Sequence, residues 1–103
     1  MAGHPLQPTH LAVITSTSNS VTLTWTPGCN GGADQTFHIQ YQKAGDVNFV
    51  NHSKTFLDDL SILMSGTIAG LQESTVYNFR LISRNRFGDS PVSEGVQRIT
   101  GKT

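Results

Sequence analysis

The chain has 103 residues, of which 36% are hydrophobic and 14% are charged, and seven basic residues balance seven acidic ones to a formal net charge of zero. This length fits one domain whose core can fold without metals or disulfides, and the composition is too apolar and aromatic for a disordered segment. The absence of a basic excess argues against nucleic-acid binding, which depends on phosphate contacts from Lys and Arg. The abundance of Ser, Thr, Asn, Gln and Gly favours strands and turns over long helices.

Targeting signals and cysteine content bear on the compartment. No apolar run approaches the roughly 18 residues of a membrane span, and the first residues lack the basic and apolar regions of a signal peptide. If the protein is extracellular, we therefore expect this chain to be a piece of a longer one. The single cysteine, Cys29, cannot form an internal disulfide.

Alternation of apolar and polar residues at period two is the strongest structural signal, and it is clearest in residues 20–26, 36–43 and 76–84. In chain order the predicted strands are residues 10–16, 20–26, 36–43, 48–51, 65–70, 76–84 and 94–100. Seven short strands separated by Gly, Pro and Asn turns predict an all-β, seven-stranded antiparallel sandwich. Residues 8–100 are expected to form the domain, with residues 1–7 and 101–103 as flexible ends.

Two structures fit residues 53–64. Five apolar residues have helical spacing there: Phe56, Leu57, Leu60, Leu63 and Met64. With Thr55 as N-cap and Asp58 three residues later, the pattern predicts a short helix around residues 55–64. In the favoured alternative, one strand ends near Leu57, Asp58 and Asp59 turn, and residues 60–69 form an extra strand. We expect this apolar segment to cover the core rather than to dock a partner.

Several motifs occur in a characteristic order from residue 8 to residue 100. "SVTLTW" ends at Trp25 and is followed by Pro27, and "TFHIQY" ends at Tyr41. Further positions in this order are Leu71, Thr75, Tyr77, Asn85, Gly88 and Ser90. Together these motifs resemble a fibronectin type III domain, although Glu73 stands where that family has a proline. The resemblance implies an immunoglobulin-like sandwich with Trp25, Tyr41, Leu71 and Tyr77 in its core, and a tyrosine corner in which the Tyr77 hydroxyl bonds to upstream backbone.

The stretch "WTPGCNGG" after the second predicted strand resembles a loop of immunoglobulin-superfamily adhesion receptors of the nephrin type. That resemblance implies an interaction or spacer module in an extracellular cell-surface receptor, beside other immunoglobulin-like or fibronectin type III domains. A membrane span would then lie outside this chain, and the isolated domain would be monomeric. The alternative is a cytoplasmic module of a muscle or cytoskeletal scaffold protein, which a free Cys29 suits equally well.

Catalysis is not indicated, and no cofactor or metal is implied. The four histidines lie on unrelated segments without paired metal-ligand spacing: His4, His10, His38 and His52. "GCNGG" lacks the Lys-Ser/Thr pair and the helix of a phosphate-binding loop. Nothing indicates an activating histidine beside Cys29. The glycines of this loop are interpreted as turn formers between two strands.

One face and one turn are candidate partner-binding surfaces. Arg80 and Arg84 project from the same outward face of a strand with Ile82 exposed between them, and neighbouring strands are expected to add His38, Gln40 and Arg98. Such a face fits an acidic partner or a sulfated glycan, with a plain solvated sheet face as the simpler interpretation.

The turn at residues 85–91 is the second candidate. In this turn Phe87 is either a contact residue or part of the core. It also interrupts an Arg-Gly-Asp triplet, so integrin binding is not expected.

Asn51-His52-Ser53 is the one N-glycosylation acceptor triplet in the sequence. A glycan on Asn51 would lie near the predicted edge strand and keep it from pairing with other chains.

Overall fold

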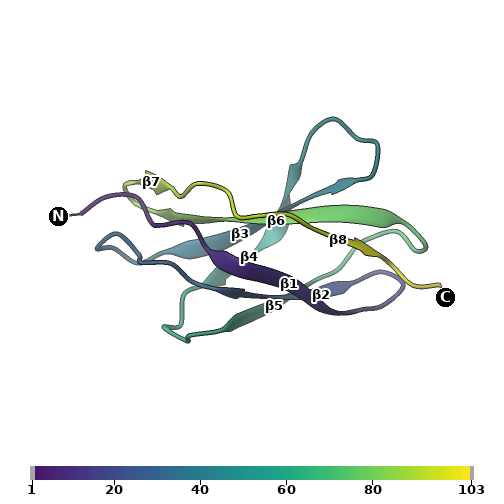
Figure 1. Ribbon diagram of the computed structural model, residues 1–103, viewed down its shortest axis with the longest axis horizontal. Helices are drawn as coiled ribbons and strands as arrows, with labels where there is room; N and C mark the ends of the chain where they lie inside the picture. Colours follow the sequence, from purple (N-terminus) through teal and green to yellow (C-terminus); the bar gives the residue numbers. More distant parts are fainter. Residues whose placement is uncertain (1, 103) are drawn as a thin grey trace.

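The computed structural model describes residues 2–102 and contains only strands, turns and loops over that range (Figure 1). The strands are β1 (Thr9–Ser16), β2 (Val21–Thr26), β3 (Thr36–Lys43), β4 (Val50–Leu57), β5 (Met64–Ile68), β6 (Val76–Asn85), β7 (Gly88–Asp89) and β8 (Val96–Ile99). One antiparallel sheet has the order β1-β2-β5, and the other has the order β4-β3-β6, with β7 and β8 both paired to the far side of β6. The predicted sandwich is confirmed.

The segment paired to the far side of β6 is divided into β7 and β8. Between these two strands, serine hydroxyls accept hydrogen bonds from the backbone amides of β6. The backbone amides of Leu81 and Ser83 on β6 donate to the hydroxyls of Ser93 and Ser90, each at 2.9 Å. These hydroxyls satisfy the backbone amides of β6 between β7 and β8, so the segment between the two strands stays bonded to β6 without forming a continuous strand. The short β7 was not predicted, and β8 lies within the predicted strand of residues 94–100.

The core lies between the two sheets and is centred on Trp25, which is fully buried. Its ring centroid lies 5.5 Å from that of Phe37 and 5.6 Å from that of Phe56, so the tryptophan joins the two sheets. Gly66 on β5 makes room for this packing, because a Cβ there would come within 2.5 Å of the Phe56 ring. The alternation of β2, β3 and β6 predicted these inward faces.

The segment of residues 53–64 contains no helix. The preceding strand ends at Leu57 as expected. The next strand begins at Met64, close to the predicted range of 65–70 but later than the alternative range of 60–69, and it lies in the other sheet. The side-chain carboxylates explain the interruption. Asp58 accepts from the amide of Leu60 at 2.8 Å, and Asp59 accepts from the amide of Ser61 at 2.9 Å. These local bonds compete with both helix and ladder.

The expectation that this apolar segment covers the core is right only at its ends. Phe56 packs against the core and Met64 is buried, whereas the aliphatic residues between them are exposed. The segment therefore crosses from one sheet to the other as a loop with an apolar outer surface.

The first residues lie along the loop that follows β2. The amide of Gly3 donates to the carbonyl of Gly31 at 2.8 Å, and the amide of Leu6 donates to that of Cys29 at 2.9 Å. Pro5 is buried against this loop end of the sandwich. The flexibility expected for residues 1–7 and 101–103 stays a prediction, and Met1 and Thr103 lie outside the described residues.

Two glycines of this loop permit the close approach. Gly31 has φ +73°, and a Cβ at this position would collide with the carbonyl oxygens of Gly3 and His4. A Cβ at Gly28 would come within 2.9 Å of the carbonyl oxygen of Leu6. The glycines thus serve backbone packing as well as turning, while Cys29 is exposed.

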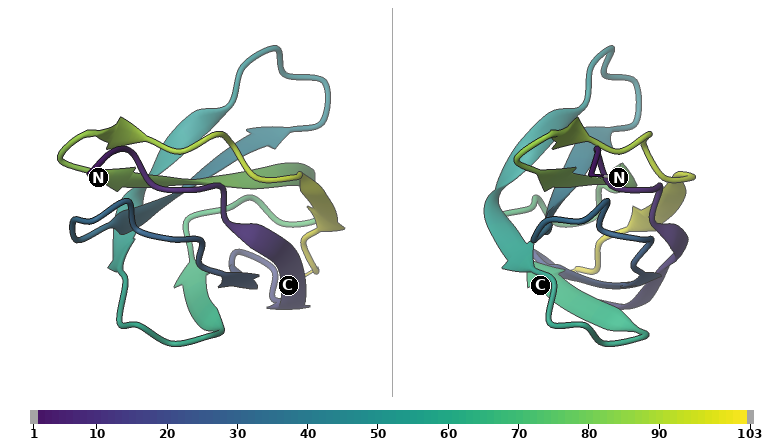
Figure 2. Two further views of the ribbon diagram at one scale, coloured as in Figure 1. Left: turned by 60° about the vertical axis from the view of Figure 1, so that its left-hand side comes forward. Right: turned by 90° about the vertical axis from the view of Figure 1, so that its left-hand side faces the viewer.

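The two chain ends lie at opposite ends of the molecule, whose longest extent is 48 Å (Figure 1). The end that holds the N-terminus also carries the loops of residues 27–35 and 58–63 and the turn after β6; we call it the N-terminal pole. The right-hand view of Figure 2 looks onto this pole. Over residues 2–102 we find no helix long and apolar enough to cross a membrane.

Candidate interaction face

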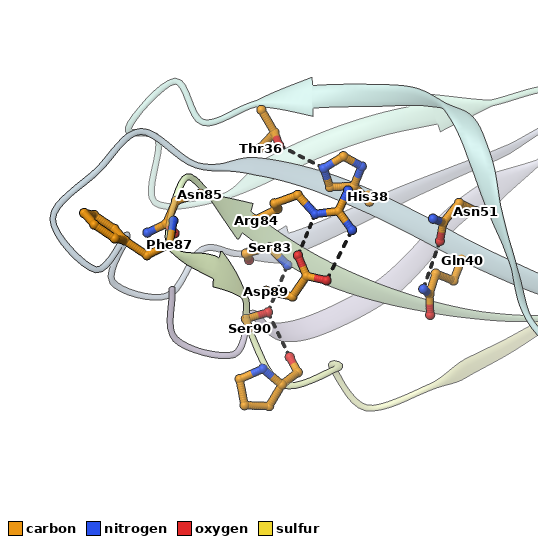
Figure 3. A network of polar contacts seen from close by, with 11 residues as sticks. Thr36, His38, Gln40, Asn51, Ser83, Arg84, Asn85, Phe87, Asp89 and Ser90 are labelled. Carbon is orange, nitrogen blue, oxygen red and sulfur yellow. Dashed lines mark hydrogen bonds and ion pairs between the residues drawn. The ribbon is translucent and has the colours of Figure 1, made fainter. Parts of the chain in front are cut away.

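The outer face of the β3–β6 pair carries side chains that the strand register places opposite one another, and Figure 3 shows the part of this face around His38, Gln40 and Arg84. The backbone register places Arg80 opposite Gln40, Ile82 opposite His38, and Arg84 opposite Thr36. Directly opposed residues on one face of an antiparallel pair lie close enough to interact. The interactions available to each candidate residue on β6 therefore depend on the residue opposite it on β3.

Arg80 is held in place by its neighbours. Its Nε donates to Gln40 Oε1 at 2.6 Å, and its guanidinium carbon lies 4.0 Å from the centroid of the Phe49 ring. Gln40 in turn donates to Asn51 Oδ1 at 2.9 Å, so this row crosses from β6 through β3 to β4. Stacking on Phe49 was not predicted, since Phe49 lies outside the alternating segments.

Arg84 is paired with Asp89 across the β6–β7 hairpin. Its Nε donates to Asp89 Oδ1 at 2.5 Å, and a second bond of 3.2 Å makes the pair bidentate. Hydrogen bonding to Arg84 holds the pKa of Asp89 below its ordinary value, and the same bond raises the pKa of Arg84. Both side chains are about half exposed, so the pair contributes roughly 0–1 kcal/mol to stability. It does neutralise one of the charges expected to attract an acidic partner.

Ile82 was expected to be exposed, and this prediction is wrong. Only 8% of its surface is accessible, although it lies on the outer face between Arg80 and Arg84. Its neighbour His38 is itself partly covered and bonded to Thr36 Oγ1 at 2.9 Å. Burial lowers the pKa of His38, the positive charge of Arg84 lowers it further, and Asp89 opposes both effects.

Arg98 was expected on this face, and that prediction is also wrong. Arg98 lies opposite Tyr77, whose side chain points into the core, so alternation turns Arg98 away from the outer face. Its Nε donates to Ser16 Oγ at 3.1 Å and so joins β8 to β1 of the other sheet. Gln97 of β8 does reach the outer face, where it donates to Asn78 Oδ1 at 3.0 Å.

Phe87 lies apart from the other three candidates, at the N-terminal pole, and projects away from the sheet in Figure 3. It is 46% exposed, and the Arg86 guanidinium carbon lies 4.8 Å from its ring centroid. Phe87 is therefore not a core residue. The four candidates do not form one site: Arg80, Ile82 and Arg84 lie along the sheet face, and Phe87 lies at its end.

Asn85 belongs to one of the sequence motifs, but the sequence did not predict that its side chain would join separate segments of the chain. Its buried side-chain amide donates to the carbonyls of Gly3 and Asn30, both at 2.7 Å, and its Oδ1 accepts from the amide of Phe87 at 2.8 Å. One side chain thus orders three segments of the N-terminal pole.

The glycosylation candidate is sterically accessible. Asn51 and Ser53 are exposed on β4, an edge strand of its sheet. Asn51 uses Oδ1 for its bond to Gln40, and among the described residues its Nδ2 has no hydrogen-bond acceptor. The nitrogen that would carry a glycan is therefore free.

The four residues assigned to the core by resemblance lie between the sheets. Trp25, Leu71 and Tyr77 are buried, and Tyr41 packs at the edge of the cluster. The Tyr77 hydroxyl accepts a hydrogen bond of 2.8 Å from the backbone amide of Gln72. This is the geometry of a tyrosine corner.

Within residues 2–102, no three His, Cys, Asp or Glu side chains gather in a way that could hold a metal ion. Two antiparallel sheets and the tyrosine corner define an immunoglobulin-like β-sandwich. The family model of the fibronectin type III domain matches residues 6–99, and the chain belongs to that family. This family's domain is a non-catalytic module.

Known relatives share this domain within much longer proteins. The chain is 36% identical to human nephrin over 90 residues, covering 87% of this chain and 7% of nephrin. It is also 36% identical to receptor-type tyrosine-protein phosphatase F of Danio rerio over 99 residues, covering 95% of this chain and 5% of that protein. Among solved structures, domains A168–A170 of titin match with a TM-score of 0.81 and 25% identity, covering 96% of this chain and 33% of that one.

Proposed function

We propose that this chain is a non-catalytic interaction and spacer module of an extracellular, cell-surface adhesion receptor. The observation that carries the proposal is the 36% identity to human nephrin across 87% of the chain. The loop after β2 is consistent with it, because "WTPGCNGG" resembles the loop of nephrin-type adhesion receptors. A second relative bears the name of a receptor, although its phosphatase activity is not proposed for this domain.

The shape of the molecule suits a spacer. The chain ends leave from opposite poles of a sandwich 48 Å long, so neighbouring domains are held apart by a packed core rather than by a flexible linker (Figure 1). A partner would meet two exposed areas: the face with Arg80 and Arg84, and the pole with Phe87. We propose the second as the stronger contact, because Phe87 is half exposed and aromatic residues are enriched in protein contacts.

Localisation of the natural full-length protein tests this proposal. Cells expressing it are labelled with a membrane-impermeant biotin reagent, and the labelled protein is recovered on streptavidin. We expect recovery together with a known surface receptor, and no recovery of a cytosolic marker. Confinement to the cytosol in intact cells would overturn the proposal.

A cytoplasmic module of a muscle or cytoskeletal protein is the second candidate. The match to titin favours it, and Cys29, an exposed free thiol, is compatible with a reducing compartment. The same labelling experiment separates the two candidates, because a cytoplasmic protein reacts with the reagent only after the cells are permeabilised.

A further inference from the structure

Four large aliphatic side chains are exposed on one short stretch at the N-terminal pole. The exposed fractions are 76% for Leu57, 83% for Leu60, 88% for Ile62 and 60% for Leu63. Single exposed apolar residues are common on soluble proteins, but a contiguous group of them marks a contact surface. We call these four residues the apolar loop.

Leu60 has an unfavourable backbone conformation as well as an exposed side chain. Its φ is 67°, in the left-handed region that Gly and Asn adopt more readily than a branched aliphatic residue. Neither burial nor local geometry within this domain explains a leucine here. Its apolar side chain is explained if another surface covers it.

The backbone of the apolar loop is already ordered. Asp58 Oδ2 accepts from Gln35 Nε2 at 2.8 Å, while its Oδ1 accepts from the amide of Leu60. Asp59 orders the following turn through the amide of Ser61. A partner that binds this loop therefore has little backbone to immobilise, which reduces the entropic cost of binding.

The position of the loop indicates which partner it meets. The loop of residues 58–62 and the loop of residues 26–30 together line a depression of about 360 Å³. The loop after β2, which continues beyond residue 30, also holds the N-terminal segment through the backbone carbonyls of Gly31 and Cys29. Any polypeptide that precedes residue 2 therefore leaves from a fixed point on the same pole (Figure 2).

The size of the apolar loop favours a tethered partner over a free one. A stable interface between separate proteins uses roughly 20–30 residues on each side, many more than this loop offers. A covalently linked neighbour works at an effective concentration of about millimolar, so a smaller contact suffices. The relatives, of which this chain spans 7% and 5%, have ample length for such a neighbour.

We infer that the apolar loop packs against the domain that precedes this one in the full-length polypeptide. The side chains of Leu60 and Ile62 enter an apolar surface of that domain, and Lys or Arg side chains at its rim face Asp58 and Asp59. This inference rests on the proposed function as a module of a multidomain protein, and it names the neighbour and the residues that meet it.

The test uses the natural two-domain protein that joins the upstream domain to residues 1–103, compared with the isolated chain. Nitrogen-15 relaxation is expected to give one shared rotational correlation time for both domains, and the methyl resonances of Leu60 and Ile62 are expected to shift on joining. Leu60→Asn with Ile62→Ser should abolish the common tumbling. Val47→Ser is the matched control, because Val47 is 92% exposed on the loop at the far end of β3.

A stability measurement separates contact from internal structure. In the isolated chain, Leu60→Asn should leave the urea midpoint unchanged or raise it, since Asn tolerates positive φ and no buried contact is lost. A lowered midpoint, independent tumbling with unshifted methyl groups, or the absence of an upstream domain would each overturn the inference. So would a concentration-dependent dimer of the isolated chain that Leu60→Asn dissociates, because the occupant would then be a second copy. Surface labelling, which tests the proposed function, is independent of all these outcomes.

Discussion

The side-chain amide of Asn85 donates a hydrogen bond of 2.7 Å to the carbonyl oxygen of Gly3, 82 positions earlier in the chain. A second bond of the same length reaches Asn30, and Asn85 itself is only 8% exposed. The end of β6 is thereby joined to the N-terminal segment and to the loop after β2. This one amide therefore supplies two of the hydrogen bonds that order the N-terminal pole, beside the backbone bonds from Gly3 and Leu6.

Asn85→Asp should release the N-terminal segment. Aspartate keeps the size of the side chain but replaces the nitrogen that serves two carbonyls with an oxygen that repels them. We expect a loss of about 1–3 kcal/mol in the free energy of unfolding in urea, and faster hydrogen exchange at the amide of Leu6. Asn78→Asp is the control, because Asn78 lies on the outer face and its amide donates to one partly buried side chain, Gln42 Oε1 at 3.2 Å, so the loss of stability should be smaller and the exchange at Leu6 unchanged. An unchanged exchange rate at Leu6 would contradict the role assigned to Asn85.

Tyr77→Phe tests the tyrosine corner. The change removes only the hydroxyl that accepts from Gln72 and leaves that amide without its partner, so stability should fall by about 1–3 kcal/mol. Tyr41→Phe supplies the comparison, because the Tyr41 hydroxyl makes no hydrogen bond within the described residues. Equal losses for the two variants in urea denaturation would show that the corner contributes no more than an ordinary hydroxyl.

His38 should make the domain less stable in mild acid. Its folded pKa lies below the ordinary value of 6.5, so the unfolded chain binds the proton more tightly. Stability is fully present above pH 6.5 and falls as the pH drops from there to the folded pKa. His38→Gln should flatten this part of the urea-midpoint profile, and an unchanged slope would contradict the prediction.

Proton NMR titration of His38 tests the causes of this shift. Arg84→Gln should raise the pKa because it removes a positive charge, whereas Asp89→Asn should lower it because it removes a negative one. An unchanged pKa of His38 in both variants would show that burial alone sets the value.

Asn51 is predicted to carry an N-linked glycan when the chain is secreted. After secretory expression in mammalian cells, intact mass should fall on treatment with peptide N-glycosidase F, and Asn51→Gln should abolish the difference. Ser53→Thr keeps the acceptor triplet and should keep the glycan. Because Asn51 bonds to Gln40, the glycan would lie beside Arg80 and restrict access to that part of the face. A secreted protein with no glycan would refute the prediction.

The fold was predictable wherever one periodicity dominates. Strands β2, β3 and β6 alternate cleanly, and their bounds match the predicted ranges within about a residue at each end. The loop of residues 58–63 was harder, because the spacing of its leucines fits a helix. The decisive groups there are the carboxylates of Asp58 and Asp59, whose bonds to nearby amides override the apolar pattern.

The surroundings of the surface residues were less predictable. Alternation indicates which side of a strand a residue faces, but not which side chains of other strands lie next to it. Ile82 was assigned to the correct face, yet it is buried there. Arg98 was assigned to the wrong side, because the sequence alone does not give the register of β8 against Tyr77. The side chain of Asn85 bonds to Gly3 and Asn30, which lie 82 and 55 positions earlier in the chain. No local sequence pattern indicates such distant contacts.

The attachment of residues 3–7 also determines how the domain bears mechanical load. A pull on the N-terminus acts first on the bonds from Gly3 to Gly31 and from Leu6 to Cys29, before it reaches the edge strand β1. Since Asn85 belongs to β6, part of that force passes directly into the opposite sheet. Tension is thereby divided between the two layers of the sandwich, instead of peeling β1 from β2 one residue at a time.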